Sequence, residues 1–191
     1  ANDNPPVIGS DGGGATAAIS LAENATAVAD VDATDPDAGQ TLTYSIVGGA
    51  DAASFTIDAA SGAIAFAAAP NFEAPSDADS DNIYQLTIGV TDGNGGTDTQ
   101  SIAVAVTGIN EAPGNIAPTA ALLSEQARAG TVVAIVTASD PDAGDLFTFT
   151  LVTDGAGRFV VDPASGRLQV APGAVFDFQT EPSHGLVLRV T

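Results

Sequence analysis

The chain has no cysteine, methionine, tryptophan or lysine, and few aromatic residues of any kind. Without cysteine it cannot form the disulfides on which small extracellular domains often depend, so another stiffening device, such as bound metal, is needed if it is extracellular. No stretch approaches the roughly 18 consecutive apolar residues of a membrane span, so we expect no membrane insertion of this fragment. The first residues lack the basic and apolar segments of a signal peptide, and the missing initiator methionine suggests a piece of a longer protein.

Basic residues are also scarce: 24 Asp and Glu stand against 4 Lys and Arg, for a formal net charge of −20. Such a surface repels nucleic-acid phosphates and anionic lipid, so we expect no nucleic-acid partner. It favours cations. An acidic surface that only keeps the protein soluble would have the same composition, so the positions of the acidic residues have to decide.

An internal repeat of about 105 residues organises the chain. The segments 31–39 and 136–144 both contain Asp-Pro-Asp-Ala-Gly, and their first aspartates, Asp35 and Asp140, are 105 positions apart. A Phe-x-(Ile/Val)-Asp motif followed by Ser-Gly also recurs, with Phe55 and Phe159 offset by 104. We therefore divide the chain into a linker at 1–6, a first repeat at 7–111, a second linker at 112–118 and a second repeat at 119–191.

Apolar residues alternate with period two in the segments 41–46, 63–66, 85–91 and 100–106, as in strands that cover a core with one face. Turn clusters separate these segments, and residues 92–96 predict a hairpin. About seven short strands per 100 residues, without a helical period, predict an all-β fold of two tandem seven-strand antiparallel β-sandwiches. The second repeat ends before the counterpart of 98–106, so we expect it to lack its last strand and to expose an unpaired edge.

Acidic and amide side chains gather in the expected loops and strand ends, which is where a sandwich could hold calcium. Calcium takes six to eight oxygen ligands from carboxylates, carbonyls and water. The candidate ligands of the first repeat and of the segment before it are Asn2, Asp3, Asn4, Glu23, Asp35, Asp37, Asn71, Glu73 and Asp92. Asp and Asn also cap turns without any metal, so turn chemistry is the alternative interpretation.

In these residues the chain resembles the cadherin superfamily, in the variant common in large bacterial surface adhesins. The resemblance covers essentially the whole chain and implies Greek-key, immunoglobulin-like sandwiches. Its motifs, in family order, are Asn2-Asp3-Asn4-Pro5-Pro6, Ala22-Glu23-Asn24, Asp35-Pro36-Asp37, Asn71-Phe72-Glu73 and Asp92-Gly93.

The resemblance implies Ca²⁺ as the cofactor, bound at the junctions between successive repeats. The junction before the first repeat would use Asn2, Asp3, Asn4, Asp35, Asp37 and Asp92. The central junction would use Glu23, Glu73, Asp140 and Asp142, with the linker role taken by Asn110 and Glu111 or by Asn115. A third half-site would contain Glu125 and Asp177.

Three departures from the family pattern weaken this expectation. Asn71 stands where the family usually has Asp, and Gln179 stands where it has Glu, so each keeps an oxygen but loses a charge. The central linker is longer and less acidic than the usual form. We therefore expect the central site to hold fewer ions, more weakly. We expect Asp77 to Asp81 to form a solvated acidic loop, with the binding of a peripheral ion as the alternative, and we expect His184 to lie at the surface.

No arrangement of residues predicts catalysis, so we expect a protein that is not an enzyme. We interpret the chain as a secreted, cell-surface repeat in which Ca²⁺ stiffens the junctions and supports adhesion, with adjacent repeats of the same chain as its partners. One alternative is a filament subunit, in which residues 2–8 of an identical subunit complete the open sheet by donor-strand addition. The other is a carbohydrate-binding module with surface glycans as partners, for which only Tyr44 and Tyr84 could serve among tyrosines.

Overall fold

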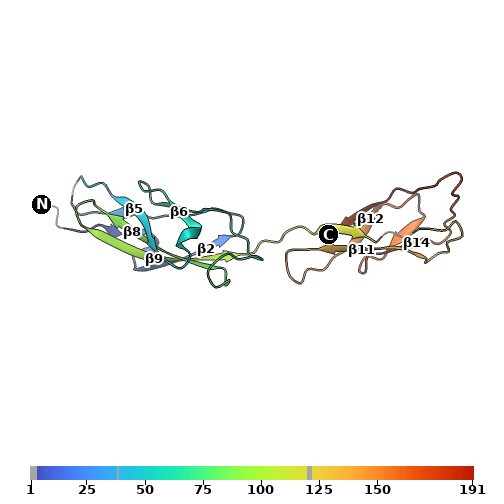
Figure 1. Ribbon diagram of the computed structural model, residues 1–191, viewed down its shortest axis with the longest axis horizontal. Coiled ribbons are helices and arrows are strands. Elements are labelled where there is room, and N and C mark those ends of the chain that lie inside the picture. The colour runs from blue at the N-terminus through green and yellow to red at the C-terminus, as the bar shows by residue number, and fades with distance from the viewer. Residues whose placement is uncertain (1–3, 38, 120–121) are drawn as a thin grey trace. The chain divides into compact units, whose positions relative to one another are not determined.

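The computed structural model describes residues 4–37, 39–119 and 122–191, and nearly all of its regular structure is β-strand (Figure 1). The all-β class expected from the sequence is confirmed. The chain divides into two compact units, Ala1–Ile109 and Asn110–Thr191. Helical structure in the described residues is limited to the 3-10 turns η1 (Ser10–Gly12) and η2 (Ala52–Ser54), and no helix there is long and apolar enough to cross a membrane.

In the described part of the first unit, nine short strands form three sheets, a finer division than the seven strands expected. One sheet has the strand order β2-β9-β8-β5, a second has the order β3-β7-β6, and β1 pairs with β4. The strands are β1 (Val7–Ile8), β2 (Thr16–Ala22), β3 (Ala27–Asp30), β4 (Ala33–Thr34), β5 (Thr43–Gly48), β6 (Phe55–Ile57), β7 (Ala63–Phe66), β8 (Ile83–Thr91) and β9 (Thr97–Thr107).

Period-two alternation builds the core of this unit, as the sequence predicts. Leu86, Ile88 and Val90 of β8 are each at most 1% exposed and face the core together with Val104 of β9. The strands β8 and β9 are antiparallel, with Thr91 opposite Thr97, so the hairpin expected at 92–96 is confirmed.

One pairing departs from the antiparallel expectation, because β2 runs parallel to β9, with Thr16 opposite Ser101. The glycine-rich stretch between β1 and β2 explains this. It carries the chain from the β1–β4 pair to the other sheet, and Gly12 and Gly13 adopt positive φ angles of 87° and 67° there. A side chain at these angles would be strained.

The second unit repeats much of this plan with strands β10 (Gly114–Pro118), β11 (Val132–Ser139), β12 (Phe149–Thr153), β13 (Phe159–Val161), β14 (Arg167–Val170) and β15 (Val187–Val190). One sheet has the order β10-β11-β14-β13, and β12 pairs with β15. Residues 114–118 were expected to belong to a linker, but they pair with β11, in the way that β1 pairs with β4. Among the described residues β15 pairs with β12 alone.

The Ser-Gly motif of both repeats forms the same tight turn. Asp58 Oδ1 accepts hydrogen bonds from the backbone N–H (2.8 Å) and hydroxyl (3.0 Å) of Ser61, and Asp162 binds Ser165 in the same way (2.8 and 2.7 Å). Gly62 follows with a φ of 77°, and a Cβ there would lie 2.2 Å from the carbonyl oxygen of Val31. The glycine is therefore required both by the backbone angle and by the close approach of a neighbouring strand.

Candidate metal centre

Asp35 and Asp37 lie at one end of the first unit, in the loop that follows β4. The backbone N–H of Asp37 donates to Asp35 Oδ1 (2.8 Å), and the backbone N–H of Asn4 donates to Asp37 Oδ2 (3.0 Å). The structure thus brings three of the predicted ligands of this end together. Asn2 and Asp3, predicted for the same site, lie outside the described residues.

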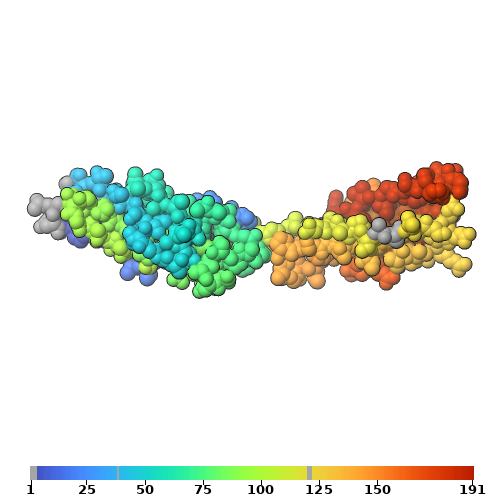
Figure 2. Space-filling view, viewed as in Figure 1, coloured from blue at the N-terminus to red at the C-terminus, as the bar shows by residue number. Residues whose placement is uncertain are grey.

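Asp92 reaches the same end from the turn between β8 and β9. It is 4% exposed, and its Oδ1 accepts hydrogen bonds from the backbone N–H groups of Asn94 (2.8 Å) and Gly96 (2.9 Å). Asp92 and Asn4 line one polar cavity. The turn also contacts the Asp35–Asp37 loop, because Asn94 Nδ2 donates to Gln40 Oε1 (3.0 Å); Figure 2 shows the light-blue loop near residue 40 beside the yellow-green turn.

Glu23 marks the opposite end of the first unit, where β2 ends. It is 2% exposed, and its two carboxylate oxygens accept hydrogen bonds from the backbone N–H groups of Phe72 and Ile109, both at 2.9 Å. A carboxylate oxygen of Glu73 lies within 4.8 Å of one of Glu23. Asn71 faces elsewhere, since its Oδ1 accepts a hydrogen bond from the N–H of Ala74 (2.6 Å) and caps the local turn.

Two of these carboxylates leave an oxygen without a hydrogen bond although it is shielded from solvent: Asp35 Oδ2 and Glu73 Oε2. A buried, unpaired carboxylate oxygen is strongly unfavourable unless a cation or a donor reaches it. Both belong to the sets predicted to bind calcium, one at each end of the unit. The donor set, carboxylate and amide oxygens without nitrogen or sulfur ligands, fits a hard cation such as calcium.

The second unit repeats the arrangement of its counterpart at the end that carries Asp140 and Asp142. The backbone N–H of Asp142 donates to Asp140 Oδ1 (3.1 Å), and that of Glu111 donates to Asp142 Oδ2 (2.8 Å). Glu111 therefore occupies the position that Asn4 has in the first repeat. The side chain of Asn110 donates to the carbonyl of Glu111 (2.7 Å), whereas Asn115 binds Ser139 Oγ (3.1 Å).

Asp145 is a residue that the sequence interpretation missed. Its carboxylate lies within 4.8 Å of those of Asp140 and Asp142. In the sequence Asp145 is a third acidic residue, five positions after Asp140. Its equivalent in the first repeat is Gln40, so comparison of the two repeats does not predict a ligand at this position.

The far end of the second unit holds the counterparts of Glu23 and Glu73. The backbone N–H of Phe178 donates to Glu125 Oε1 (2.6 Å), as that of Phe72 donates to Glu23. Gln179 takes the place of Glu73. With its amide in the orientation that satisfies its neighbours, Gln179 Nε2 lies 3.0 Å from Glu125 Oε1 and 3.1 Å from Asp177 Oδ1.

Asp77, Asp79 and Asp81, expected as a solvated loop, form another close group with carboxylate oxygens within 4.8 Å. Asp77 is 6% exposed and accepts hydrogen bonds from the backbone N–H groups of Asp81 (2.8 Å) and Asn82 (3.3 Å). The negative charge of Asp81 raises the pKa of Asp79. Asp77 is thus a buried turn-forming carboxylate, while Asp79 and Asp81 are exposed.

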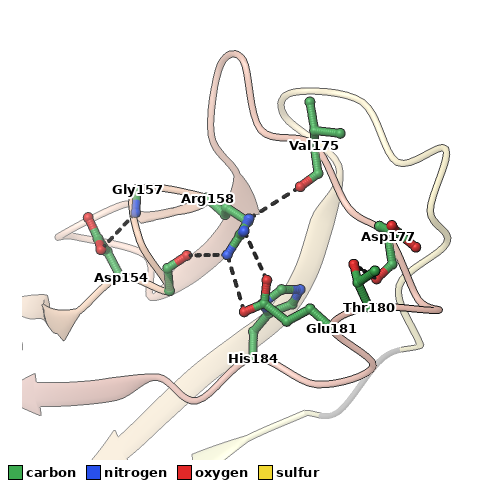
Figure 3. A network of polar contacts seen from close by, with 9 residues as sticks. Asp154, Gly157, Arg158, Val175, Asp177, Thr180, Glu181 and His184 are labelled. Atoms are coloured by element: carbon green, nitrogen blue, oxygen red, sulfur yellow. Dashed lines mark hydrogen bonds and ion pairs between the residues drawn. The ribbon is translucent and has the colours of Figure 1, made fainter.

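His184 is not the surface histidine expected. Its side chain is 11% exposed, and its ring packs against Phe159 and Phe176, with ring centroids 5.7 and 5.3 Å away. Its Nδ1 lies 3.1 Å from Glu181 Oε1, and Glu181 also forms an ion pair with Arg158 (2.9 Å) (Figure 3). The burial of His184 could not be predicted from the sequence, because the histidine does not lie in a segment with alternating apolar residues.

Comparison with known proteins agrees with this fold and these motifs. The model of the cadherin domain family matches residues 17–107. Human Protocadherin-16 is 31% identical over 160 residues, which are 80% of this chain and 5% of that protein. Protocadherin-like wing polarity protein stan of Drosophila melanogaster is 34% identical over 167 residues, 78% of this chain and 4% of that protein.

Among solved structures, the extracellular domain of Protocadherin GammaB4 matches with a TM-score of 0.61 and 27% identity, covering 100% of this chain and 30% of that one. Human cadherin-23 EC21–23 matches with a TM-score of 0.57 and 22% identity, over 94% of this chain and 57% of that one, and shows the fold alone. The chain spans 3–5% of the length of the curated relatives. Residues 17–107 therefore form a cadherin domain, and the chain belongs to the cadherin superfamily.

Proposed function

We propose that this chain is a calcium-binding, extracellular adhesion repeat whose ends are ordered by Ca²⁺. The observation that carries the proposal is the pair of Glu23 and Glu73. Their carboxylate oxygens lie within 4.8 Å, Glu23 is 2% exposed, and Glu73 Oε2 is buried without a hydrogen bond. Two like charges in partial burial repel each other, and a divalent cation converts that repulsion into attraction.

The residues of the chain supply a preformed set of ligands at the other end of the first unit. The Asp35–Asp37 hydrogen bond and the Asn4–Asp37 hydrogen bond fix the loop, so the carboxylates need little rearrangement on binding. Asp92 is held in place by the N–H groups of its own turn. Asp140, Asp142 and Glu111 provide the equivalent frame in the second unit. Asn2, Asp3 and Asn110 are further candidates from the sequence.

Calcium bound at such a site supplies charge neutralisation and a rigid cross-link between its ligands. In the cadherin pattern the ligands come from successive repeats, so binding would stiffen the chain of domains and hold an adhesive surface away from the cell. Adjacent repeats of the same chain are then the first partners. The relatives above are animal protocadherins, which favours this adhesion role in general over a bacterial adhesin in particular.

The two alternative functions receive less support. A carbohydrate site needs accessible rings, but Tyr44 and Tyr84 are 7% and 1% exposed and pack in the core. Donor-strand exchange needs a free N-terminal segment, but Val7 and Ile8 pair with β4, and Ile8 is 2% exposed. Its N–H also donates to Asp98 Oδ2 (2.8 Å).

Isothermal titration of the chain with CaCl₂ after EDTA removal tests the proposal. We expect saturable binding that loses one class of site in the double variant Asp35→Asn, Asp37→Asn. The double variant Asp30→Asn, Asp32→Asn is a control matched in charge, since both residues are exposed and lie outside the candidate sites. An isotherm that is the same in both double variants would exclude the Asp35–Asp37 loop as a ligand set.

A further inference from the structure

The two repeats end in equivalent loops that differ in one chemical respect. In the first repeat Glu23 faces Glu73, carboxylate to carboxylate. In the second repeat Glu125 faces Gln179, and with its amide in the orientation that satisfies its neighbours the Gln179 nitrogen lies within hydrogen-bond distance of both Glu125 (3.0 Å) and Asp177 (3.1 Å). The amide thus reaches both carboxylates that a cation would otherwise neutralise.

Formal charge alone does not separate the two ends. Each loop holds two carboxylates and one amide, because Asn71 in the first repeat corresponds to Asp177 in the second. The difference is the position of the amide. Asn71 turns its oxygen to the N–H of Ala74 and leaves Glu23 and Glu73 facing each other, whereas Gln179 points its N–H groups at the carboxylates.

The loop of the second repeat is also held by a cation of the protein itself. Arg158 forms an ion pair with Glu181 (2.9 Å) and donates to the backbone carbonyls of Val175 (3.2 Å) and Gly155 (3.2 Å), so it ties the two sides of the loop to the turn before β13 (Figure 3). His184 packs behind Glu181 against Phe176. The loop is therefore ordered by contacts that involve no metal.

Asp177 stays an acceptor within this arrangement. The backbone N–H of Gln179 donates to Asp177 Oδ1 (3.0 Å), and the Gln179 side-chain amide, in the orientation that satisfies its neighbours, lies 3.1 Å from the same oxygen. The Asp177 carboxylate is therefore matched by donors of the Gln179 amide and of its own loop. A calcium ion would have to displace these donors before it could bind the two carboxylates.

From this geometry we propose that Gln179 makes the far end of the second repeat insensitive to calcium, so that this end is ordered by the Gln179 amide and the Arg158 ion pair instead. The proposal rests on the calcium-binding function proposed above, as the exception within it. In a chain of such repeats, a calcium-insensitive end would keep the same structure whether calcium is high or low.

Two backbone amides report on the two ends within one molecule. The N–H of Phe72 donates to Glu23, and the N–H of Phe178 donates to Glu125, so ¹H–¹⁵N NMR spectra during a calcium titration read both sites at once. We expect the Phe72 signal to shift with calcium and the Phe178 signal to stay fixed, or to shift with an apparent Kd at least about tenfold higher, because calcium must first displace the Gln179 amide from the two carboxylates.

The variant Gln179→Glu should make Phe178 respond to calcium, and Glu73→Gln should weaken the response of Phe72. Gln126→Glu adds the same charge beside Glu125, on an exposed residue, and should leave Phe178 insensitive. The proposal would be overturned if the Phe72 and Phe178 signals of the unaltered chain shifted with the same calcium dependence. It would also be overturned if the Phe178 signal of Gln179→Glu did not shift with calcium, or if Gln126→Glu gained as large a calcium response at Phe178 as Gln179→Glu. If the Phe72 signal of the unaltered chain did not shift with calcium, this would instead count against the proposed function. The comparison of Gln179→Glu with the unaltered chain would still decide the role of Gln179.

Discussion

Glu23 and Glu73 lie with carboxylate oxygens within 4.8 Å of each other, at the end of the first domain where β2 ends. At an effective dielectric constant of about 20, two unit charges at this separation repel by about 3 kcal/mol. The pair is therefore a source of instability in the absence of a cation, and a source of affinity for one.

Replacing Glu73 by Gln should separate these two effects. In EDTA we expect Glu73→Gln to raise the free energy of unfolding of the first domain by about 1 kcal/mol, because the repulsion is removed and water screens part of it already. In saturating calcium the same variant should be less stable than the unaltered chain. Urea unfolding in the two buffers measures both, and a loss of stability in EDTA would show that Glu73 has another structural role.

Glu23 also has a structural role, since its two carboxylate oxygens accept hydrogen bonds from two backbone N–H groups. Glu23→Ala leaves the N–H groups of Phe72 and Ile109 without their acceptor, and we expect a loss of about 2–4 kcal/mol in unfolding free energy, with or without calcium. Glu23→Gln keeps one acceptor oxygen and should lose less. Equal losses in the two variants would mean that the hydrogen bonds are not the source of the effect.

The repeated glycine of the Ser-Gly turn gives a prediction that is independent of metal. Gly62→Ala and Gly166→Ala should each lower the unfolding free energy of their own domain by about 2 kcal/mol or more, because a Cβ would lie 2.2 Å from the carbonyl oxygen of Val31 or Val136. Gly9→Ala is the control, since a Cβ there meets nothing within 4 Å. Thermal melts of the three variants should rank Gly9→Ala close to the unaltered chain.

The aspartate of the same turn predicts a dependence on pH. Hydrogen bonds from Ser61 lower the pKa of Asp58, and those from Ser165 lower the pKa of Asp162. A carboxylate whose pKa is lower in the folded than in the unfolded state adds stability above its unfolded pKa and loses it as pH falls through the folded value. Melting temperatures should therefore fall below about pH 4, the ordinary range of an aspartate, and less steeply in the double variant Asp58→Asn, Asp162→Asn. A double variant with an unchanged acid slope would show that other carboxylates govern it.

Much of the fold could be predicted because its signals are local. The alternation of apolar residues in 85–91 and 100–106 predicts the strands β8 and β9. The Asp-Pro-Asp motif, which occurs twice, predicts the internal repeat and the loops that contain Asp35 and Asp140. The parallel pairing of β2 with β9 could not be predicted, because it follows from a glycine-rich crossing whose direction has no sequence signature. The equivalence of Glu111 with Asn4 also required the structure, since a backbone N–H, not a side chain, makes the contact with Asp142.

The departures at the candidate sites were visible in the sequence, but their consequences were not. Asn71 and Gln179 each replace a carboxylate by an amide, so from the sequence alone both replacements predict the same effect, the loss of one negative charge. Only the side-chain geometry shows that one amide caps a turn and the other faces two carboxylates. Burial of His184 depends on contacts with Phe159 and Phe176, and these residues lie 25 and 8 positions away in the sequence.

The central claim is that calcium orders this protein, and thermal unfolding of the chain in EDTA, in calcium and in magnesium tests it most directly. Calcium at a hundredfold excess over Kd adds about 2.7 kcal/mol to a folded state that alone binds it, which for a domain of this size raises Tm by roughly 10–20 °C. The account predicts this rise with calcium, little or none with magnesium, and its reduction in Asp35→Asn, Asp37→Asn. A Tm that is the same in EDTA and in millimolar calcium would contradict it and leave the acidic motifs as turns.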